Sequence, residues 1–284
     1  INKDNIYILD NDDEYAENFG KQWKKYRDIQ IDSKNNFNIS KNFLEDILFN
    51  QLNVLNNKNV LEIGCGAGRF TEHIVKYAKK CVSVDLSTAI FYNISKEKEN
   101  LILVKADLHK LNIKNKFDIV ICRGVIQHTP NPYKTIKKLA SFINKDGCLY
   151  FDVYPKPKIN ILHPKYSIWR PIIQKMIKYE TMDNFLCKNI KILLKIKRFV
   201  KLIFLNNDFL ADSIMPIWDY KNKLKLNDQQ LEKWGILDTL DGLYAKYDNP
   251  LSHLEISNFL IKNNLEIIEN RKDINCFKVQ IKNR

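Results

Sequence analysis

Three glycines and two aspartates carry the strongest chemical signal in this chain. Gly64, Gly66 and Gly68 directly follow a short apolar run, where glycine lets the backbone approach a ligand closely. Asp85 ends the next apolar run, and Asp107 follows the third. The first carboxylate can accept hydrogen bonds from both hydroxyls of a ribose, and the second from the exocyclic amine of an adenine. The pattern predicts a nucleoside bound along the carboxyl ends of neighbouring strands.

The spacing of the glycines separates this site from two other nucleotide sites. The dinucleotide fingerprint needs Gly or Ala at position 69, where this chain has Arg69. A P-loop needs Gly-Lys followed by Ser or Thr, and the turn is not followed by that sequence. The pattern therefore argues against a nicotinamide or flavin site and excludes a P-loop.

The elements that must position these residues alternate between strands and helices. We expect strands at 60–63, 81–85, 101–104, 117–122, 148–154, 265–268 and 276–281. We expect helices over about 70–78, 89–98, 133–143 and 251–262. This alternation predicts an α/β fold with a mostly parallel sheet that is covered by helices on both faces.

The same pattern divides the chain into three parts. Residues 1–57 are polar, look helical and are rich in aromatic residues around Trp23, so we expect an N-terminal helical cap. Residues 155–249 lack a strand pattern and are expected to form a helical insertion before the last helix. The sheet domain is expected at 58–154 and 250–284.

Four short motifs share the order and spacing of those of a known family. They are Val60-Leu61-Glu62-Ile63-Gly64-Cys65-Gly66-Ala67-Gly68-Arg69-Phe70, Val84-Asp85-Leu86-Ser87, Ala106-Asp107-Leu108 and Phe117-Asp118-Ile119-Val120. They resemble the motifs of class I S-adenosylmethionine-dependent methyltransferases of the small-molecule type. The resemblance implies a Rossmann-like, seven-stranded sheet with an antiparallel last strand. It also implies S-adenosylmethionine as cofactor, S-adenosylhomocysteine as product, and no metal.

The resemblance also implies which residues hold the cofactor. The glycine turn would flank its methionine part, and Glu62 would hold the turn or the amino group. Asp85 would bind the ribose, while Arg123 and Gly124 would lie beside the sulfonium. The full predicted set is Glu62, Gly64, Cys65, Gly66, Gly68, Asp85, Leu86, Asp107, Leu108, Arg123 and Gly124.

The catalytic residues are less well specified. Methyl transfer is an in-line displacement, so the protein must mainly align acceptor, methyl and sulfur. A hydroxyl or ammonium acceptor must also lose a proton, for which a base helps. His128, in the loop after the fourth strand, is the first candidate base; the other interpretation is a histidine that shapes the pocket through hydrogen bonds. Gln127 beside it is expected, with His128, to bind substrate.

Further candidates lie in residues 238–250, which we expect to form a loop before the last helix. Asp241 and Tyr244 are catalytic candidates, and Tyr244 and Tyr247 are candidates for binding the acceptor. An equally open interpretation is that the tyrosines anchor the insertion.

The acceptor is expected to be a small polar molecule. Enzymes that methylate amino groups of DNA place an Asn/Asp-Pro-Pro-aromatic tetrad after the fourth strand, where this chain has Cys122-Arg123-Gly124-Val125. Cys122 also lacks the neighbouring Pro of cytosine C5 enzymes. These features argue against nucleic acid. We expect a sugar or another polar secondary metabolite as acceptor, with O-methylation favoured and nitrogen or carbon left open. The alternatives are methylation of RNA or a lipid headgroup through the insertion, and a cofactor-binding regulatory subunit without catalysis.

The positive charge of the chain is concentrated in one segment. The net charge is +13, and residues 155–205 contain twelve Lys and Arg but only two acidic residues. Residues 187–205 predict an amphipathic helix with one apolar face, made of Ile192, Leu193, Ile196, Phe199, Val200 and Ile203. We expect this face to pack as a lid on the sheet domain. The alternative is weak contact of residues 155–205 with an anionic membrane or a phosphorylated substrate.

The cysteines and the hydropathy indicate the compartment. The six cysteines are scattered without a C-x-x-C pair, which favours buried thiols in a reducing compartment and gives no cluster of metal ligands. The sequence shows neither an apolar stretch of membrane-spanning length nor a signal sequence. We therefore expect a cytoplasmic protein, whose oligomeric state the sequence does not indicate.

Overall fold

The computed structural model describes residues 2–3, 6–10, 16–156 and 163–282. The chain divides into two compact units. The sheet unit comprises Ile1–Lys156 and Lys246–Arg284, and the helical unit comprises Pro157–Ala245. Each unit is described by itself.

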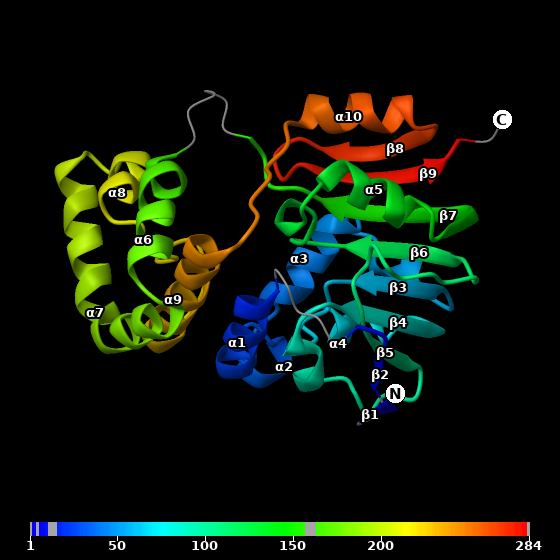
Figure 1. Ribbon diagram of the computed structural model, residues 1–284, viewed down its shortest axis with the longest axis horizontal. Helices are drawn as coiled ribbons and strands as arrows, with labels where there is room; N and C mark the ends of the chain where they lie inside the picture. The colour runs from blue at the N-terminus through cyan, green and yellow to red at the C-terminus, as the bar shows by residue number, and fades with distance from the viewer. Residues whose placement is uncertain (1, 4–5, 11–15, 157–162, 283–284) are drawn as a thin grey trace. The chain divides into compact units, whose positions relative to one another are not determined.

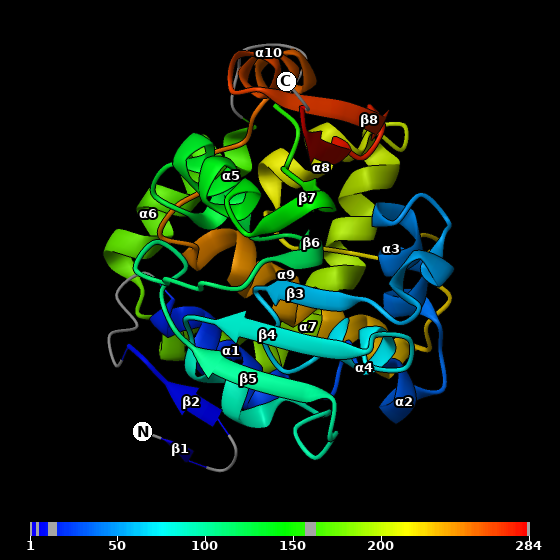
Figure 2. The ribbon, with the colours of Figure 1, turned by 90° about the vertical axis from the view of Figure 1, so that its right-hand side faces the viewer.

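The sheet unit is built on a nine-stranded sheet with the order β1-β2-β5-β4-β3-β6-β7-β9-β8 (Figure 2). The strands are β1 (Asn2–Lys3), β2 (Ile6–Ile8), β3 (Asn59–Ile63), β4 (Lys80–Asp85), β5 (Leu101–Lys105), β6 (Phe117–Cys122), β7 (Ile143–Asp152), β8 (Leu265–Arg271) and β9 (Cys276–Ile281). Strands β2 to β7 pair in parallel, and β9 pairs antiparallel with both β7 and β8. This confirms the predicted mostly parallel sheet with an antiparallel last strand.

Helices cover both faces of this sheet. They are α1 (Glu17–Tyr26), α2 (Asp32–Asn35), α3 (Ile39–Ile47), η1 (Leu52–Leu55), α4 (Thr71–Ile74), η2 (Thr88–Tyr92), η3 (Ile126–His128), α5 (Pro132–Ala140) and α10 (His253–Lys262). Successive strand residues enter opposite cores, since Leu61 lies in the core with α5 and α10 and Val60 in the core with α3 and α4. The two cores explain why the strands read as unbroken apolar runs.

The structure corrects three predicted elements of the sheet unit. The N-terminal part is not wholly helical, because β2 pairs with β5 and buries Ile6 completely. A run of three residues is too short for its alternating pattern to stand out. The helix expected at 89–98 is only the 3-10 helix η2, and the one expected at 70–78 is α-helical only over α4.

The helical unit contains η4 (Lys165–Trp169), α6 (Arg170–Met176), α7 (Tyr179–Ile203), α8 (Asp208–Ile214) and α9 (Asp228–Tyr244) (Figure 1). Helix α9 starts at a capping box in which Asn227 and Gln230 bond each other's backbone. Among the described helices, none combines the length and apolar character needed to cross a bilayer.

One feature of the helical unit differs from expectation. Residues 238–244 belong to α9 rather than to a loop. Gly242 lies within this helix, where a Cβ would lie 2.2 Å from the Trp218 ring. The apolar face of α7 that we expected to pack as a lid on the sheet domain does not line the interior of the helical unit, and its packing on the sheet domain stays a prediction. Met182, Leu186 and other residues fill that interior instead. Helix α7 carries apolar residues on two faces, so periodicity alone could not show which one lines the interior of the unit.

Candidate functional site

The glycine turn between β3 and α4 has a backbone that only glycine adopts readily. Gly64, Gly66 and Gly68 have φ angles of +80°, +49° and +94°, in the left-handed region. The turn is also tightly packed, since a Cβ on Gly64 would lie 2.1 Å from Val125 and one on Gly68 2.5 Å from Asn93. The spacing that suggested a ligand site therefore corresponds to a left-handed backbone that, at Gly64 and Gly68, also has no room for a side chain.

Asp85, at the end of β4, is oriented by this turn. Its Oδ2 accepts a hydrogen bond of 2.7 Å from the Gly66 N–H, and its Oδ1 accepts bonds from the backbone and hydroxyl of Ser87 (2.8 and 2.7 Å). Burial raises the pKa of Asp85, and these hydrogen bonds oppose the shift. Each carboxylate oxygen can accept more than one bond, so the held carboxylate can still receive ligand hydroxyls.

Glu62 provides a buried acceptor beneath the turn. Its side chain is 2% exposed, and Oε2 accepts bonds from the hydroxyls of Thr71 (2.7 Å) and Ser83 (2.6 Å). Burial raises its pKa to about 7, the two hydroxyls oppose this, and the nearby Asp85 adds to it. Oε1 has no hydrogen-bond partner among the described residues. Buried polar atoms are nearly always paired, so Oε1 is suited to a donor from a ligand.

The loop after β5 holds the two residues assigned to adenine. Asp107 Oδ1 accepts a bond of 2.8 Å from the His109 N–H, and Leu108 is buried. Leu86 is half-buried after Asp85. Cys65 is buried, and burial raises its thiol pKa well above the ordinary value, which makes it an unreactive part of the turn.

The loop after β6 leaves space beside the glycine turn. Gly124 has a φ angle of +68°, and a Cβ there would meet no described atom within 4 Å. Its N–H donates to Asp152 Oδ1 over 2.6 Å, and Arg123 lies 3.6 Å from Asp152 Oδ2 with its guanidinium over Phe43. Arg123 is thus part of an ion pair at the end of β7, and Gly124 borders open space.

His128 and Gln127 lie in η3 directly after that loop. His128 Nδ1 lies 3.0 Å from the backbone oxygen of Tyr247, and a carbonyl oxygen can only accept. Neutral His128 therefore carries its proton on Nδ1 and a lone pair on Nε2. The ring contacts Phe19 and Tyr154, with centroids 5.4 and 5.5 Å away. Gln127 is fully buried, and both its amide atoms lack partners among the described residues.

Asp241 and Tyr244 lie in α9, within the helical unit. The Tyr244 hydroxyl donates to the backbone oxygen of Ile177 over 2.9 Å, and its ring contacts Tyr179. Burial raises the pKa of Tyr244 to about 12. These contacts support the anchoring interpretation of Tyr244. The structure brings His128 together with Tyr247, whose contribution is its backbone, but it does not place Asp241 or Tyr244 relative to them.

Helix α1 covers the glycine turn, which the sequence suggested only through its aromatic residues. A Cβ on Gly66 would lie 3.8 Å from the Trp23 ring, and one on Gly20 2.4 Å from the Thr88 hydroxyl. Phe19, on the same helix, contacts His128. The N-terminal segment is therefore part of the site.

A buried cluster that the sequence did not reveal joins α2 to α4. His73 Nε2 lies 3.0 Å from Asp32 Oδ2 and 3.5 Å from Glu72 Oε1. One potential metal-ligand atom from each of the three residues lies within 4.8 Å of the other two. Asp32 also accepts bonds from the N–H groups of Ser40 and Lys41 at the start of α3. Burial opposes ionisation, but these partners hold the pKa of Asp32 below its usual value. Backbone donors already occupy the Asp32 oxygens and Glu72 Oε1, so the cluster is a structural link between these helices.

Known proteins similar to this chain identify the class of its central part. Residues 61–151 match the profile of a family described as "Methyltransferase domain". Together with the strand order and the glycine turn, this match identifies the segment as a methyltransferase domain of class I, with a Rossmann-like fold.

Curated relatives share only part of their length with this chain. A malonyl-[acyl-carrier protein] O-methyltransferase from Priestia megaterium is 29% identical over 157 residues, 53% of each protein. A ubiquinone biosynthesis O-methyltransferase from Hydrogenovibrio crunogenus is 27% identical over 107 residues, 36% of this chain and 44% of the relative. The chain thus spans about half the length of these relatives.

A solved structure is similar over nearly the whole chain. The magnesium protoporphyrin IX methyltransferase of Synechocystis, with bound S-adenosylhomocysteine, is 14% identical and covers 94% of this chain and 95% of its own, with a TM-score of 0.49.

Proposed function

We propose that this protein transfers a methyl group from S-adenosylmethionine to a hydroxyl group of a small polar molecule, such as a sugar or secondary metabolite. The observation that carries the proposal is one sheet edge, where left-handed glycines, Asp85 and the open space at Gly124 meet. The matched methyltransferase domain contains all of them. The names of two curated relatives, both O-methyltransferases, support oxygen as the acceptor atom.

The residues present fit this cofactor, which supplies an electrophilic methyl group on a sulfonium. Asp85 would accept hydrogen bonds from the ribose hydroxyls, and Asp107 from the adenine amine, with Leu108 against the ring. Glu62 Oε1, which has no hydrogen-bond partner in the described part of the chain, would accept a hydrogen bond from the amino group. Gly124 leaves room for the methionine part and the sulfonium.

His128 would act as the base that removes the acceptor proton. The Tyr247 carbonyl holds the proton on Nδ1, which leaves the Nε2 lone pair for the substrate. The aromatic rings of Phe19 and Tyr154 fix the imidazole plane. The Gln127 amide, which is buried and has no partner among the residues that the structure describes, would bind a polar group of the acceptor.

We add three proposals, on the contacts of the basic segment, on the location of the protein and on further contacts with the acceptor. Contact of residues 155–205 with an anionic membrane or phosphorylated substrate is supported by their basic composition. A cytoplasmic location is supported by the cysteines, none of which forms a disulfide within the described part of the chain. Asp241, Tyr244 and Tyr247 remain candidates for contact with the acceptor.

Calorimetric titration with S-adenosylmethionine and S-adenosylhomocysteine tests the proposal. We expect Asp85→Asn to weaken both affinities at least tenfold. Each hydrogen bond from a ribose hydroxyl to the charged carboxylate would contribute about 1.5–3 kcal/mol to the binding free energy. Asp146→Asn is the matched control, since Asp146 is exposed. If neither ligand gave any binding heat with the unmodified protein, the proposal would be contradicted.

A further inference from the structure

The exposed seam of α7 is the largest feature that the methyltransferase site does not explain. It consists of Phe185, Ile192, Ile196, Phe199 and Ile203, which are 48, 60, 45, 63 and 60% exposed. Their spacing of seven, four, three and four residues places them along one stripe of the helix. Single exposed apolar residues are ordinary, but a contiguous apolar patch marks an interaction surface.

The apolar surface continues past the end of α7. Leu205 and Asn206 both have left-handed backbones, with φ angles of +51° and +63°, which is uncommon for leucine. Leu205 is 92% exposed at this turn, so it protrudes into solvent. Further exposed apolar residues follow at Phe209, Leu210 and Ile214.

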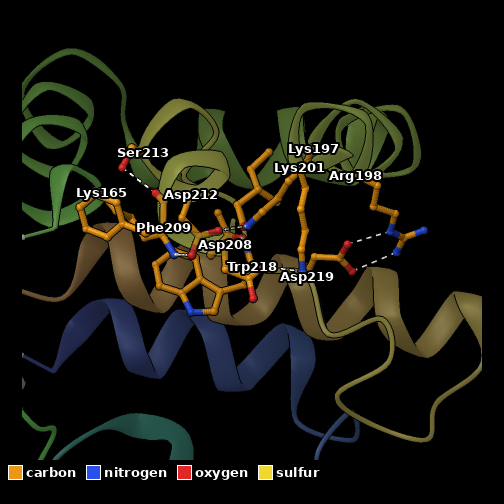
Figure 3. A network of polar contacts seen from close by, with 12 residues as sticks. Lys165, Lys197, Arg198, Lys201, Asp208, Phe209, Asp212, Ser213, Trp218 and Asp219 are labelled. Atoms are coloured by element: carbon orange, nitrogen blue, oxygen red, sulfur yellow. Dashed lines mark hydrogen bonds and ion pairs between the residues drawn. The ribbon is translucent and has the colours of Figure 1, made fainter. Parts of the chain in front are cut away.

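The basic residues of α7 fall into two sets. Lys197 is buried beside Asp212, and Arg198 binds both oxygens of Asp219 over 2.7 and 3.0 Å (Figure 3). In contrast, Lys188, Lys191 and Lys195 are exposed, and at 100° per residue Lys188 and Lys195 border the seam. From 184 to 207 the sequence contains no acidic residue. From residue 184 to its end, the outer surface of α7 therefore carries apolar and cationic side chains and no acidic ones.

We propose that the exposed seam and its lysines bind the surface of an anionic lipid bilayer, with α7 lying in the plane of the interface. Apolar side chains next to lysines that can extend to the headgroups are what such a helix requires. A second copy fits worse, because two seams would bring lysines against lysines. A protruding Leu205 suits a deformable bilayer better than a preformed protein groove. The proposal is independent of the methyl-transfer reaction.

Vesicle flotation of the full chain tests the apolar part. We expect binding to phosphatidylcholine vesicles that contain one quarter phosphatidylglycerol at low salt, and weak binding at high salt or to pure phosphatidylcholine. Ile196→Gln/Phe199→Gln should lower the partition coefficient at least tenfold. Leu254→Gln/Ile261→Gln is the matched control, since these residues are each 68% exposed on α10 of the sheet unit, and it should bind as the unmodified protein does.

The lysines are tested in the same assay. Lys188→Gln/Lys195→Gln should lower partitioning to the anionic vesicles at least tenfold, whereas Lys96→Gln/Lys98→Gln, which removes two exposed lysines of the sheet unit, should change it less than twofold. Failure of the unmodified protein to bind at low salt would overturn the proposal. So would unchanged binding of Ile196→Gln/Phe199→Gln, or a dimer in sedimentation velocity that this variant dissociates.

Discussion

The hydrogen bond between His128 and the Tyr247 backbone decides which ring nitrogen is available to a substrate. His128→Asn should retain a donor at the Nδ1 position, and hence this bond, while removing the base. We expect the turnover number to fall by about 10²–10⁴-fold, with S-adenosylmethionine affinity changed less than threefold. Single-turnover kinetics and calorimetry measure the two quantities. Unchanged turnover would remove His128 from the reaction.

Glu62 should make stability depend on pH in a defined direction. Burial raises its pKa from 4.5 to about 7, so the folded protein binds this proton more tightly than the unfolded chain. The stabilising contribution is complete below pH 4.5 and is lost as pH rises through 7. We expect the free energy of unfolding, relative to Glu62→Gln, to fall by about 3 kcal/mol over that range.

Urea denaturation of both proteins at pH 5 and pH 8 measures this difference. Glu266→Gln is the control, because Glu266 is exposed on β8. A difference between the unmodified protein and Glu62→Gln that does not change with pH would show that Glu62 keeps an ordinary pKa.

The places of the glycine turn and Asp85 in the fold could be predicted because they depend on local sequence, while their roles toward a cofactor stay predictions. The glycine turn and Asp85 lie directly at strand ends, so a strand pattern is enough to place them. The cluster of Asp32, Glu72 and His73 could not be predicted, because about forty residues separate its members and only the packing of α2 on α4 joins them.

The loop between β6 and η3 should tolerate a side chain structurally but not functionally. Gly124→Ala adds a methyl group that meets no described atom within 4 Å, so the main structural cost is the left-handed backbone, about 1–2 kcal/mol. We expect S-adenosylmethionine affinity to fall at least tenfold, because the methyl group would occupy ligand space. Gly64→Ala is the contrasting variant: its Cβ would lie 2.1 Å from Val125, so it should lose more stability.

Strands were easier to predict than helices in this chain. The longer buried parallel strands, β3 to β7, appear as apolar runs, whereas the three-residue parallel strand β2 was missed. The end of α9, residues 238–244, was expected to be part of a loop, whereas the helix continues through Gly242, which makes room for Trp218. For α7, the helix was predicted, whereas the residues that fill the interior of the helical unit were not, since that choice depends on the partners α7 meets within the unit.

The helical unit should depend strongly on one carboxylate. Lys165 and Lys197, whose side chains are both 6% exposed, share Asp212, and burial lowers the pKa of Lys165. Asp212→Asn would leave two buried ammonium groups without a counter-charge, so we expect a loss of about 3 kcal/mol or more. Hydrogen exchange should show faster exchange in α7 and α9 and unchanged protection in β3 and β6.

Adding Lys165→Met to that variant should restore part of the protection, because one unpaired charge is removed. Equal loss of protection in both units would instead mean that the chain unfolds as one cooperative body. The pattern along the sequence indicated a change of architecture near residue 155, but it could not indicate that the inserted segment forms an interior of its own.

The four tryptophans are divided unevenly between the units. Trp23 belongs to the sheet unit, next to Gly66, whereas Trp169, Trp218 and Trp234 belong to the helical unit. The chain thus contains a natural optical label at the turn that we assign to the cofactor. With the other three indoles replaced by phenylalanine, fluorescence emission would follow events at that turn alone and allow stopped-flow measurement without any added dye.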